Sequence, residues 1–313
     1  DFIINIESLK DNTFWRILEQ IENNSYKLKD LADVKAGLQA YEVGTGTPTI
    51  TKEMKDKRIY HSHSKVDETY YKYLDGKNVN RYFYTWSNEY LKYGNNLASP
   101  RKNFDLFSTE RILVRQIPSK PPYCINACII KETILNDRNS MNIIYLKENP
   151  KYVLSILNSK LISFWFVHKF GKMQRGIFPQ FKINELEIFP IKNIAQKNQI
   201  KFSIFSDFLM YLYQQNSNNI LSHTDNTRIA SHLEDILNMM VYELYFEEHM
   251  KEVGIDVLQF VTPQLESLQN QAIESQIKSF YEWYQKPENA VRQRMMLIVT
   301  RSPDILAVIH KSM

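Results

Sequence analysis

The spacing of apolar residues changes near Pro190, and this change constrains the fold more than any other feature of the sequence. Beyond it, residues 195–215, 224–250 and 263–285 carry apolar side chains at helical spacing, with almost no Gly or Pro inside them. An apolar stripe that includes Leu233 is typical of a packing face rather than of a ligand site. The sequence therefore predicts an all-α C-terminal region.

Before Pro190 the pattern mixes helices and strands. Apolar spacing predicts a helix from Ile6 to Ile21, and Asn149-Pro150 is typical of the start of a second helix, which ends near Gly171. Runs of β-branched or aromatic residues predict strands at 81–86, 111–117, 123–130 and 142–146. The remaining segments are expected to be extended at 26–34, 178–182 and 186–190, and to form an exposed loop at 37–48. We therefore expect an α+β domain over residues 1–192 and a helical domain over residues 193–313.

The net charge differs between these two parts. The whole chain carries +4, which divides into +8 for residues 1–192 and −4 for residues 193–313. Within 51–120, cations alternate with many Tyr side chains. A basic and aromatic surface of this kind can neutralise phosphates and stack on bases. An equally good interpretation places the same Tyr residues on half-buried strands.

Glycine and cysteine usage excludes several classes of protein. With 8 Gly in the chain, Gly44-Thr45-Gly46 is its single Gly-x-Gly, and Pro48 after it prevents the helix that a nucleotide or S-adenosylmethionine loop needs. Cys124 and Cys128 stand in an apolar run, which indicates buried thiols and a reducing, cytoplasmic location. No signal peptide or membrane span is expected. The first residue is Asp rather than Met, and we therefore expect a fragment of a longer protein.

Motifs for catalysis fail on chemical grounds. Lys120-Pro121-Pro122-Tyr123 differs from the Asn/Asp/Ser-Pro-Pro-Tyr motif of amino methyltransferases, because a lysine ammonium has no hydrogen-bond acceptor for the target amine. Glu53-Met54-Lys55 lies in a polar segment without the hydrophobic strand that a metal-dependent nuclease uses. His61 and His63 lack further metal ligands nearby. We expect neither a catalytic residue nor a metal site in this chain.

Basic and amide side chains suited to binding remain in three places. Alternation along 111–117 puts Arg111 and Arg115 on one strand face, where they could contact DNA or form internal ion pairs. Residues 76–82 combine cations and amides around a turn, which is also the composition of an ordinary hydrophilic hairpin. Residues 171–176 form a basic loop between two glycines.

Several segments, in this order, resemble the TaqI-like C-terminal specificity domain. They are Tyr73–Tyr82, Arg111–Ile117, Leu154–Leu161 and Phe178–Ile191, preceded by a glycine-containing loop at Gly37–Gly46. This domain is the target-recognition region of DNA adenine methyltransferases and of fused type IIG restriction-modification enzymes. The acidic helical tail is similar to the helical segment that often follows it. The resemblance covers residues 26–192.

The resemblance implies a part of such an enzyme that recognises a specific sequence in double-stranded DNA. In the family, S-adenosylmethionine and the catalytic motif belong to a separate upstream domain of the same polypeptide, and Mg²⁺ is expected there where a nuclease is fused. This chain is therefore expected to bind no cofactor itself. Phosphate contacts are expected from Lys77, Lys120 and Lys172, and base contacts from Asn78, Arg81, Arg111, Arg115, Gln174 and Arg175, with Gln39 and Tyr82 as further DNA contacts.

Two other functions fit parts of the sequence. A protein-interaction module would use the acidic helical tail as its active surface. A self-contained nuclease would depend on a metal and on Glu53. The target DNA sequence is outside what one chain predicts, because side-chain reach and DNA shape both determine it.

Overall fold

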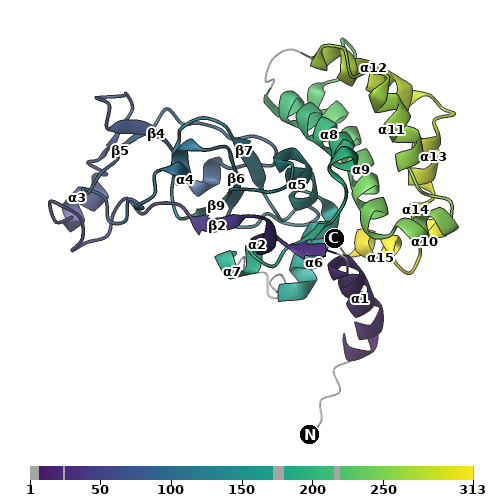
Figure 1. The fold of residues 1–313 in the computed structure, drawn as a ribbon, viewed down its shortest axis with the longest axis horizontal. Helices are drawn as coiled ribbons and strands as arrows, with labels where there is room; N and C mark the ends of the chain where they lie inside the picture. The colour runs from purple at the N-terminus through teal and green to yellow at the C-terminus, as the bar shows by residue number, and fades with distance from the viewer. Residues whose placement is uncertain (1–6, 24, 172–179, 215–218, 313) are drawn as a thin grey trace, which may run out of the picture.

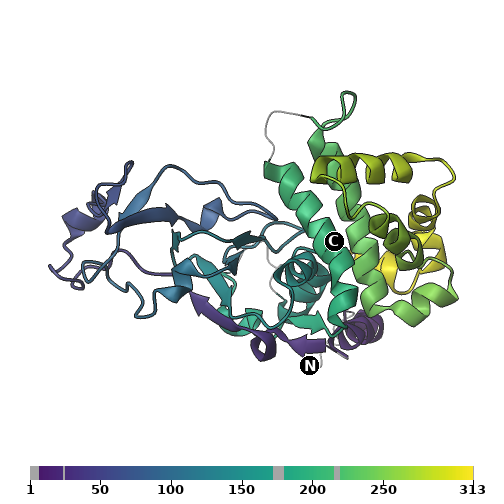
Figure 2. The ribbon, with the colours of Figure 1, turned by 45° about the horizontal axis from the view of Figure 1, so that its top comes forward.

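The computed structural model describes residues 7–23, 25–171, 180–214 and 219–312. Strands and short helices dominate up to residue 192, and helices dominate after it. In Figures 1 and 2 a small β-rich lobe and the helical region lie at opposite ends of the molecule, with a central sheet between them. The predicted order, α+β followed by all-α, is confirmed. No helix in these ranges is long and apolar enough to cross a bilayer.

The central sheet has four antiparallel strands in the order β2-β9-β6-β7. They are β2 (Asp33–Ala36), β6 (Arg111–Arg115), β7 (Ala127–Ile130) and β9 (Ser140–Ile144). Ile112 pairs with Ile143 on one side and Ile129 on the other. Because side chains alternate along a strand, Ile112 and Val114 face the core that contains the helices α5 (Pro150–Leu157) and α6 (Lys160–Phe170). Arg111, Leu113 and Arg115 face the opposite way.

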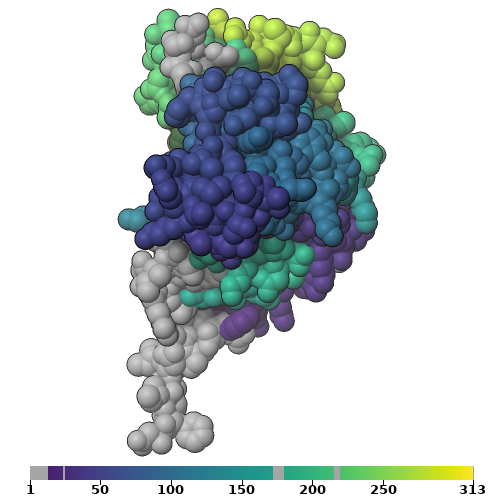
Figure 3. Space-filling model, turned by 90° about the vertical axis from the view of Figure 1, so that its left-hand side faces the viewer, coloured from purple at the N-terminus to yellow at the C-terminus, as the bar shows by residue number. Residues whose placement is uncertain are grey.

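A second sheet builds the distal lobe, which we define as residues 38–78 and 88–107 together with residues 135–136. Its strands run in the order β3-β5-β4-β8, and its own core includes Tyr73, Leu91 and Phe107. Figure 3 looks onto the outer end of this lobe. The elements are α3 (Lys52–Asp56), β3 (His61–Ser62), β4 (Tyr70–Leu74), the 3-10 helix η1 (Gly76–Asn78), β5 (Tyr90–Lys92), α4 (Asp105–Ser108) and β8 (Leu135–Asn136).

The helix predicted from Asn149 to Gly171 is two helices, so that the prediction of one helix was wrong. Asn149 caps α5 (Pro150–Leu157), and Ser159 caps α6 (Lys160–Phe170) by accepting a hydrogen bond from the Ile162 amide. Gly171 ends α6 in the left-handed region, with φ of 58°. An N-cap serine inside an apolar pattern thus restarts the helix.

The helical region packs directly on the first part of the chain. One continuous core runs from Ile17 on α1 (Glu7–Glu22) through Ile112 and Phe205 to Ile309 on α15 (Leu306–Lys311). The helices of the helical region are α8 (Gln196–Gln214), α9 (Asn226–Tyr245), α10 (Glu247–Glu252), α11 (Leu258–Glu266), α12 (Ile273–Gln285), α13 (Ala290–Met296), α14 (Ile298–Arg301) and α15 (Leu306–Lys311). The predicted boundary at residues 192–193 falls between β10 and α8, and the division into two domains stays a prediction.

Two short strands, one before and one after the strands of the central sheet in the sequence, pair with each other as a separate two-stranded sheet. Strand β1 (Ser25–Lys27) pairs with β10 (Pro190–Lys192), and α1 (Glu7–Glu22) packs on α6. The expected extended segment 26–34 also contains the short helix α2 (Leu28–Leu31), and α7 (Ile183–Leu186) lies just before β10.

Two local predictions were wrong for steric reasons. Residues 81–86 form no strand, because Tyr82 adopts φ of 69° and the chain turns back so that Val79 pairs with Tyr84. The loop at 37–48 is not wholly exposed, because Leu38 is buried. A Cβ at Gly37 would lie 2.1 Å from the Asp137 carbonyl oxygen, so this close approach requires glycine.

Candidate nucleic-acid interface

Three loops meet where β6 ends. Arg115 is the last residue of β6 and pairs with Ser140 at the start of β9. The Gln116 amide donates to the Asn139 carbonyl oxygen at 2.8 Å. Gly76 approaches the same residue so closely that a Cβ there would lie 2.5 Å from that carbonyl oxygen. The end of β6, the turn at 137–139 and η1 therefore lie together at one end of the central sheet.

Exposed basic side chains concentrate on these loops. We define the sheet-end surface as Lys77, Arg115, Lys120, Arg138 and the polar Asn139; Arg115 is half-buried and the other four are exposed. Lys77 is well exposed and lies 3.7 Å from the Asp75 carboxylate. Arg138 donates to the Gln39 side-chain oxygen at 3.1 Å. Among the described residues, Arg115 and Lys120 have no ion-pair partner within 4.0 Å.

Two members of the sheet-end surface, Arg138 and Asn139, were missed from the sequence. The signal that could have found them is the polar turn Asp137-Arg138-Asn139 between two apolar runs. Their position beside Arg115 depends on the pairing of β9 with β6, which local sequence does not reveal.

Asp137 lies under this surface and gives it a titratable charge. Its carboxylate accepts hydrogen bonds from the backbone and side-chain amides of Asn139. Burial, together with the nearby negative charge of Asp75, raises the pKa of Asp137 to about 6. The buried carboxyl thus gains a proton more readily than an exposed one.

This raised pKa predicts a stability difference with pH. Between about pH 4 and pH 6 the folded protein holds a proton on Asp137 that the unfolded chain releases, so the contribution of Asp137 to stability is lost as the pH rises through this window. Urea unfolding of the wild type and of Asp137→Asn from pH 4 to pH 7 checks this. The wild type is expected to lose stability relative to the variant as the pH rises, and parallel curves would contradict the assignment.

Arg111 does not reach the surface, and its expected base contact is corrected to a structural role. The side chain is 1% exposed, under Phe107 and the segment before β8. Its guanidinium donates to the Asn142 side-chain oxygen at 3.0 Å and to the carbonyl oxygens of Phe107, Thr109 and Ile134. Burial lowers the pKa of Arg111 to about 10. The predicted strand face is right, but the distal lobe covers this part of it.

Arg81 and Tyr82 join the first part of the chain to the helical region. Arg81 forms an ion pair with Glu234 on α9, and its guanidinium lies 3.6 Å from the centre of the Tyr123 ring. The Tyr213 hydroxyl donates to the same Glu234 at 2.9 Å. Tyr82 is 2% exposed and stacks on Tyr213. Neither residue is free to contact DNA in this arrangement, so both expectations are corrected to packing.

The other expected contacts divide by exposure. Asn78 is buried and its side-chain oxygen accepts from the Asp75 amide, so it shapes the turn instead of facing solvent. Gln39 is half-buried and holds Arg138. Lys77, Arg115 and Lys120 lie on the sheet-end surface. Lys172, Gln174 and Arg175 lie outside the described residues.

The residues tested for catalysis lie in structural contacts. Burial raises the pKa values of Cys124 and Cys128 to about 12, as expected for inert thiols. Glu53 on α3 is exposed and pairs with Lys57, the residue that follows this helix. His61 bonds to the Tyr41 hydroxyl, and burial lowers its pKa to about 3. Within the ranges that the structure describes, no three acidic, His or Cys side chains gather as a metal site would require.

Comparison with known proteins relates the chain to DNA restriction and modification. Residues 71–191 match the family described as the TaqI-like C-terminal specificity domain. The chain is also 28% identical, over 196 residues, to a Methanocaldococcus jannaschii protein named as a type II restriction enzyme and methyltransferase. This match covers 60% of the chain and 15% of the relative. The chain thus spans a small part of that relative's length.

Two solved structures resemble the chain weakly. The HsdS subunit from Thermoanaerobacter tengcongensis has a TM-score of 0.34 at 10% identity, covering 76% of this chain and 52% of the other. The type IIL restriction-modification enzyme MmeI, solved in complex with DNA, has a TM-score of 0.39 at 8% identity, covering 88% and 36%. Both scores are too low to establish a shared fold.

The family match contains all four segments, at 73–82, 111–117, 154–161 and 178–191. The resemblance predicted from those segments is therefore confirmed. The match begins at residue 71, so the interpretation of the loop at 37–46 as part of the same domain stays a prediction.

Proposed function

We propose, from the premise that residues 71–191 form a TaqI-like C-terminal specificity domain of the restriction-modification type, that this chain recognises a specific duplex DNA sequence through the sheet-end surface. The observation that supports this location is the meeting of exposed cations from three loops beside the end of β6. Every residue of the sheet-end surface lies inside the matched range. Gln39, which holds Arg138 in place, lies outside it.

The chemistry of the side chains suggests a division of labour. The guanidinium groups of Arg115 and Arg138 can donate two hydrogen bonds to the O6 and N7 atoms of guanine in the major groove. Lys77 and Lys120 present point charges that suit phosphate oxygens. Base contacts would thus determine the sequence, while the lysines would fix the position of the protein on the duplex.

Catalysis is proposed to belong to another part of the same polypeptide. A methyltransferase domain there would bind S-adenosylmethionine, and a fused nuclease would use Mg²⁺. The relative from Methanocaldococcus jannaschii, which is much longer than this chain, supports the view that the recognition part works together with such domains.

Replacing Arg115 with alanine is expected to weaken binding to the preferred duplex by about 1–3 kcal/mol and to relax specificity at one base pair. The preferred duplex is first selected by the wild type from a randomised library, and both proteins are then titrated with single-base variants of it. Arg228→Ala, an exposed arginine on α9, is the matched control and should leave the profile unchanged. Equal profiles for Arg115→Ala and the wild type would contradict a base contact.

Lys77→Ala is expected to weaken binding equally for all sequences, because a phosphate contact does not depend on the base. The slope of log affinity against log salt should fall by about 0.9. Lys131→Ala supplies a control, since Lys131 is also exposed but lies away from these loops and 3.6 Å from Glu110. An unchanged slope in Lys77→Ala would exclude Lys77 from the phosphate contacts.

A protein-interaction module in the helical region is the second candidate. Met296 on α13 and Val299 on α14 are 70% and 52% exposed, so two consecutive helices present large apolar side chains to solvent. The expected partner is the catalytic methyltransferase domain. Co-purification with that domain should be lost in Met296→Lys, and retention of the complex would count against this candidate.

A further inference from the structure

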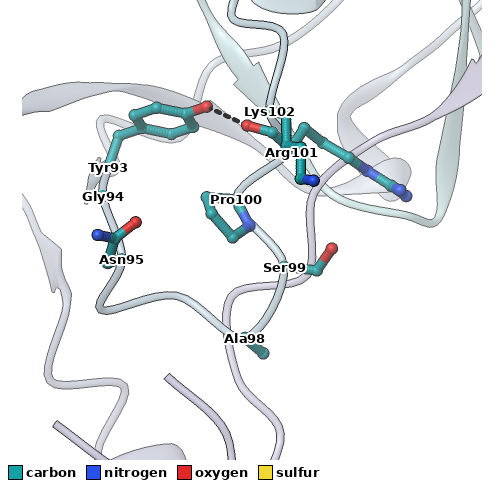
Figure 4. Close-up of a pocket in the computed structure, with 8 residues that line it drawn as sticks. All are labelled: Tyr93, Gly94, Asn95, Ala98, Ser99, Pro100, Arg101 and Lys102. Carbon is teal, nitrogen blue, oxygen red and sulfur yellow. Dashed lines mark hydrogen bonds between the residues drawn. The ribbon is translucent and has the colours of Figure 1, made fainter. Parts of the chain in front are cut away.

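A hollow of about 640 Å³ opens in the distal lobe, lined by residues 93–95 and 98–102. Figure 4 shows the Tyr93 ring and the Asn95 amide along one side of it and the Pro100 ring facing them. Tyr93, Asn95, Arg101 and Lys102 offer polar groups, and no carboxylate lines the hollow. Its walls are thus suited to an anion.

The loop that carries the two cations is held in an unusual conformation. Arg101 adopts φ of 73°, which is unfavourable for a residue with a side chain. Two hydrogen bonds maintain it: the Tyr93 hydroxyl donates to the Arg101 carbonyl oxygen at 2.7 Å, and the Arg101 Nε donates to the Gly37 carbonyl oxygen at 2.8 Å. Figure 4 shows the first of these. The backbone and the guanidinium of Arg101 are therefore held in place by the lobe.

The charges of these two residues are not neutralised by the protein. Among the described residues, no carboxylate lies within 4.0 Å of either cation. Lys102 is exposed, and a second hollow of about 380 Å³ shares both residues. Of the described residues that line the second hollow, one carries a carboxylate, Asp33, and this carboxylate pairs with Lys35 at 4.0 Å rather than with Arg101 or Lys102. A positive charge thus persists between the two hollows.

The first hollow adjoins the sheet-end surface through Gln39. The backbones of Gln39 and Ser99 exchange two hydrogen bonds, of 3.0 and 2.9 Å, and Ser99 lines the hollow. The side chain of Gln39 holds Arg138, a member of the sheet-end surface. One residue therefore separates the proposed base-reading arginine from the hollow. In B-DNA, a major groove about 12 Å wide is bordered on both sides by backbone phosphates.

We propose that the hollow at residues 93–102 binds a backbone phosphate of the duplex whose bases the sheet-end surface reads, with Lys102 and Arg101 supplying the positive charge. This inference rests on the proposed function. It assigns to the distal lobe a phosphate contact that positions the DNA and carries no sequence information. None of the contacts expected from the sequence lies on this loop.

Salt-dependent DNA binding of the full chain tests the inference. The probe is the duplex selected by the wild type, together with a scrambled duplex of equal length. Lys102→Ala is expected to lower the slope of log affinity against log salt by about 0.9 and to weaken both duplexes equally. Lys57→Ala, an exposed lysine of the same lobe that pairs with Glu53 at 2.7 Å, is the control and should retain the wild-type slope.

The outcomes separate this inference from the proposed function. A wild-type slope in Lys102→Ala, with normal wild-type binding, would overturn the phosphate site and leave the proposed function standing. A wild type that binds neither duplex at low salt would overturn both. Because Lys102 is exposed, its replacement should leave the melting temperature unchanged, and Lys102→Glu, which reverses the charge, should weaken binding more than Lys102→Ala.

Discussion

Arg81→Ala is expected to lower the free energy of unfolding by about 3–5 kcal/mol, the cost of leaving one member of a buried ion pair unpaired. The side chains of Arg81 and Glu234 are 17% and 7% exposed, so Glu234 would keep a charge that water cannot reach. The cation–π contact of Arg81 with Tyr123 would be lost as well. Urea unfolding of both proteins measures the difference.

Two further variants identify the cause of this loss. Glu234→Gln in the Arg81→Ala background removes the stranded charge and should recover part of the stability. Lys251→Ala breaks an exposed pair with Glu247, whose side chains are 57% and 62% exposed, and should cost less than about 1 kcal/mol. Similar losses in Arg81→Ala and Lys251→Ala would show that the buried pair contributes no more than a surface one.

The same contacts explain why the helical region packs on the first part of the chain. Besides Glu234, the side chain of Asn238 on α9 donates to the Tyr123 hydroxyl at 3.0 Å and accepts from the Lys160 amide at 2.8 Å. The loop at residues 116–123, which follows β6, is therefore held against α9 through Tyr123. A loss of stability in Arg81→Ala is expected to be accompanied by faster amide hydrogen exchange in this loop.

Arg111→Met is expected to destabilise the protein by about 3 kcal/mol while preserving much of the side-chain volume. The replacement removes the donor to the Asn142 side-chain oxygen and to the carbonyl oxygens of Thr109 and Ile134. It leaves the Phe107 carbonyl oxygen with the Ile134 amide as its donor. Arg115→Met, four residues along the same strand, is the matched control and should change stability by less than about 1 kcal/mol.

Thermal and urea unfolding, together with DNA titration, distinguish the two arginines. The expected pattern is a stability loss confined to Arg111→Met and an intrinsic affinity loss confined to Arg115→Met. A folded, stable Arg111→Met protein with weakened DNA binding would contradict the structural role of Arg111 and return it to the DNA interface.

The sequence predicts helices and strands well where one periodic pattern extends over many residues. The long helices α8 and α9 follow from apolar spacing, and β6 follows from its β-branched run between polar residues. Residues 81–86 have the composition of a strand, yet their aromatic side chains pack on Tyr213, more than a hundred residues away. Tertiary contacts of this kind override a local preference.

The candidate site was predicted in part, because alternation along a strand indicates a face and not what covers it. Arg111 and Arg115 do share a face of β6. Phe107 and Ile134 bury Arg111, whereas Arg115 lies at the end of the strand, where it is half-buried. Arg81 was predicted to contact DNA because the sequence does not reveal its partner, Glu234, which is 153 residues away along the chain. The side chains of Lys77 and Lys120 are exposed, as charged residues in polar segments are expected to be.

Selection of a randomised duplex library by the full chain, at two salt concentrations, tests the central proposal most directly. We expect enrichment of one defined sequence, with affinity that decreases as salt increases, and loss of preference at one base pair in Arg115→Ala. Binding that is independent of salt and enriches no sequence, or a failure to bind any duplex at low salt, would contradict DNA recognition by the sheet-end surface.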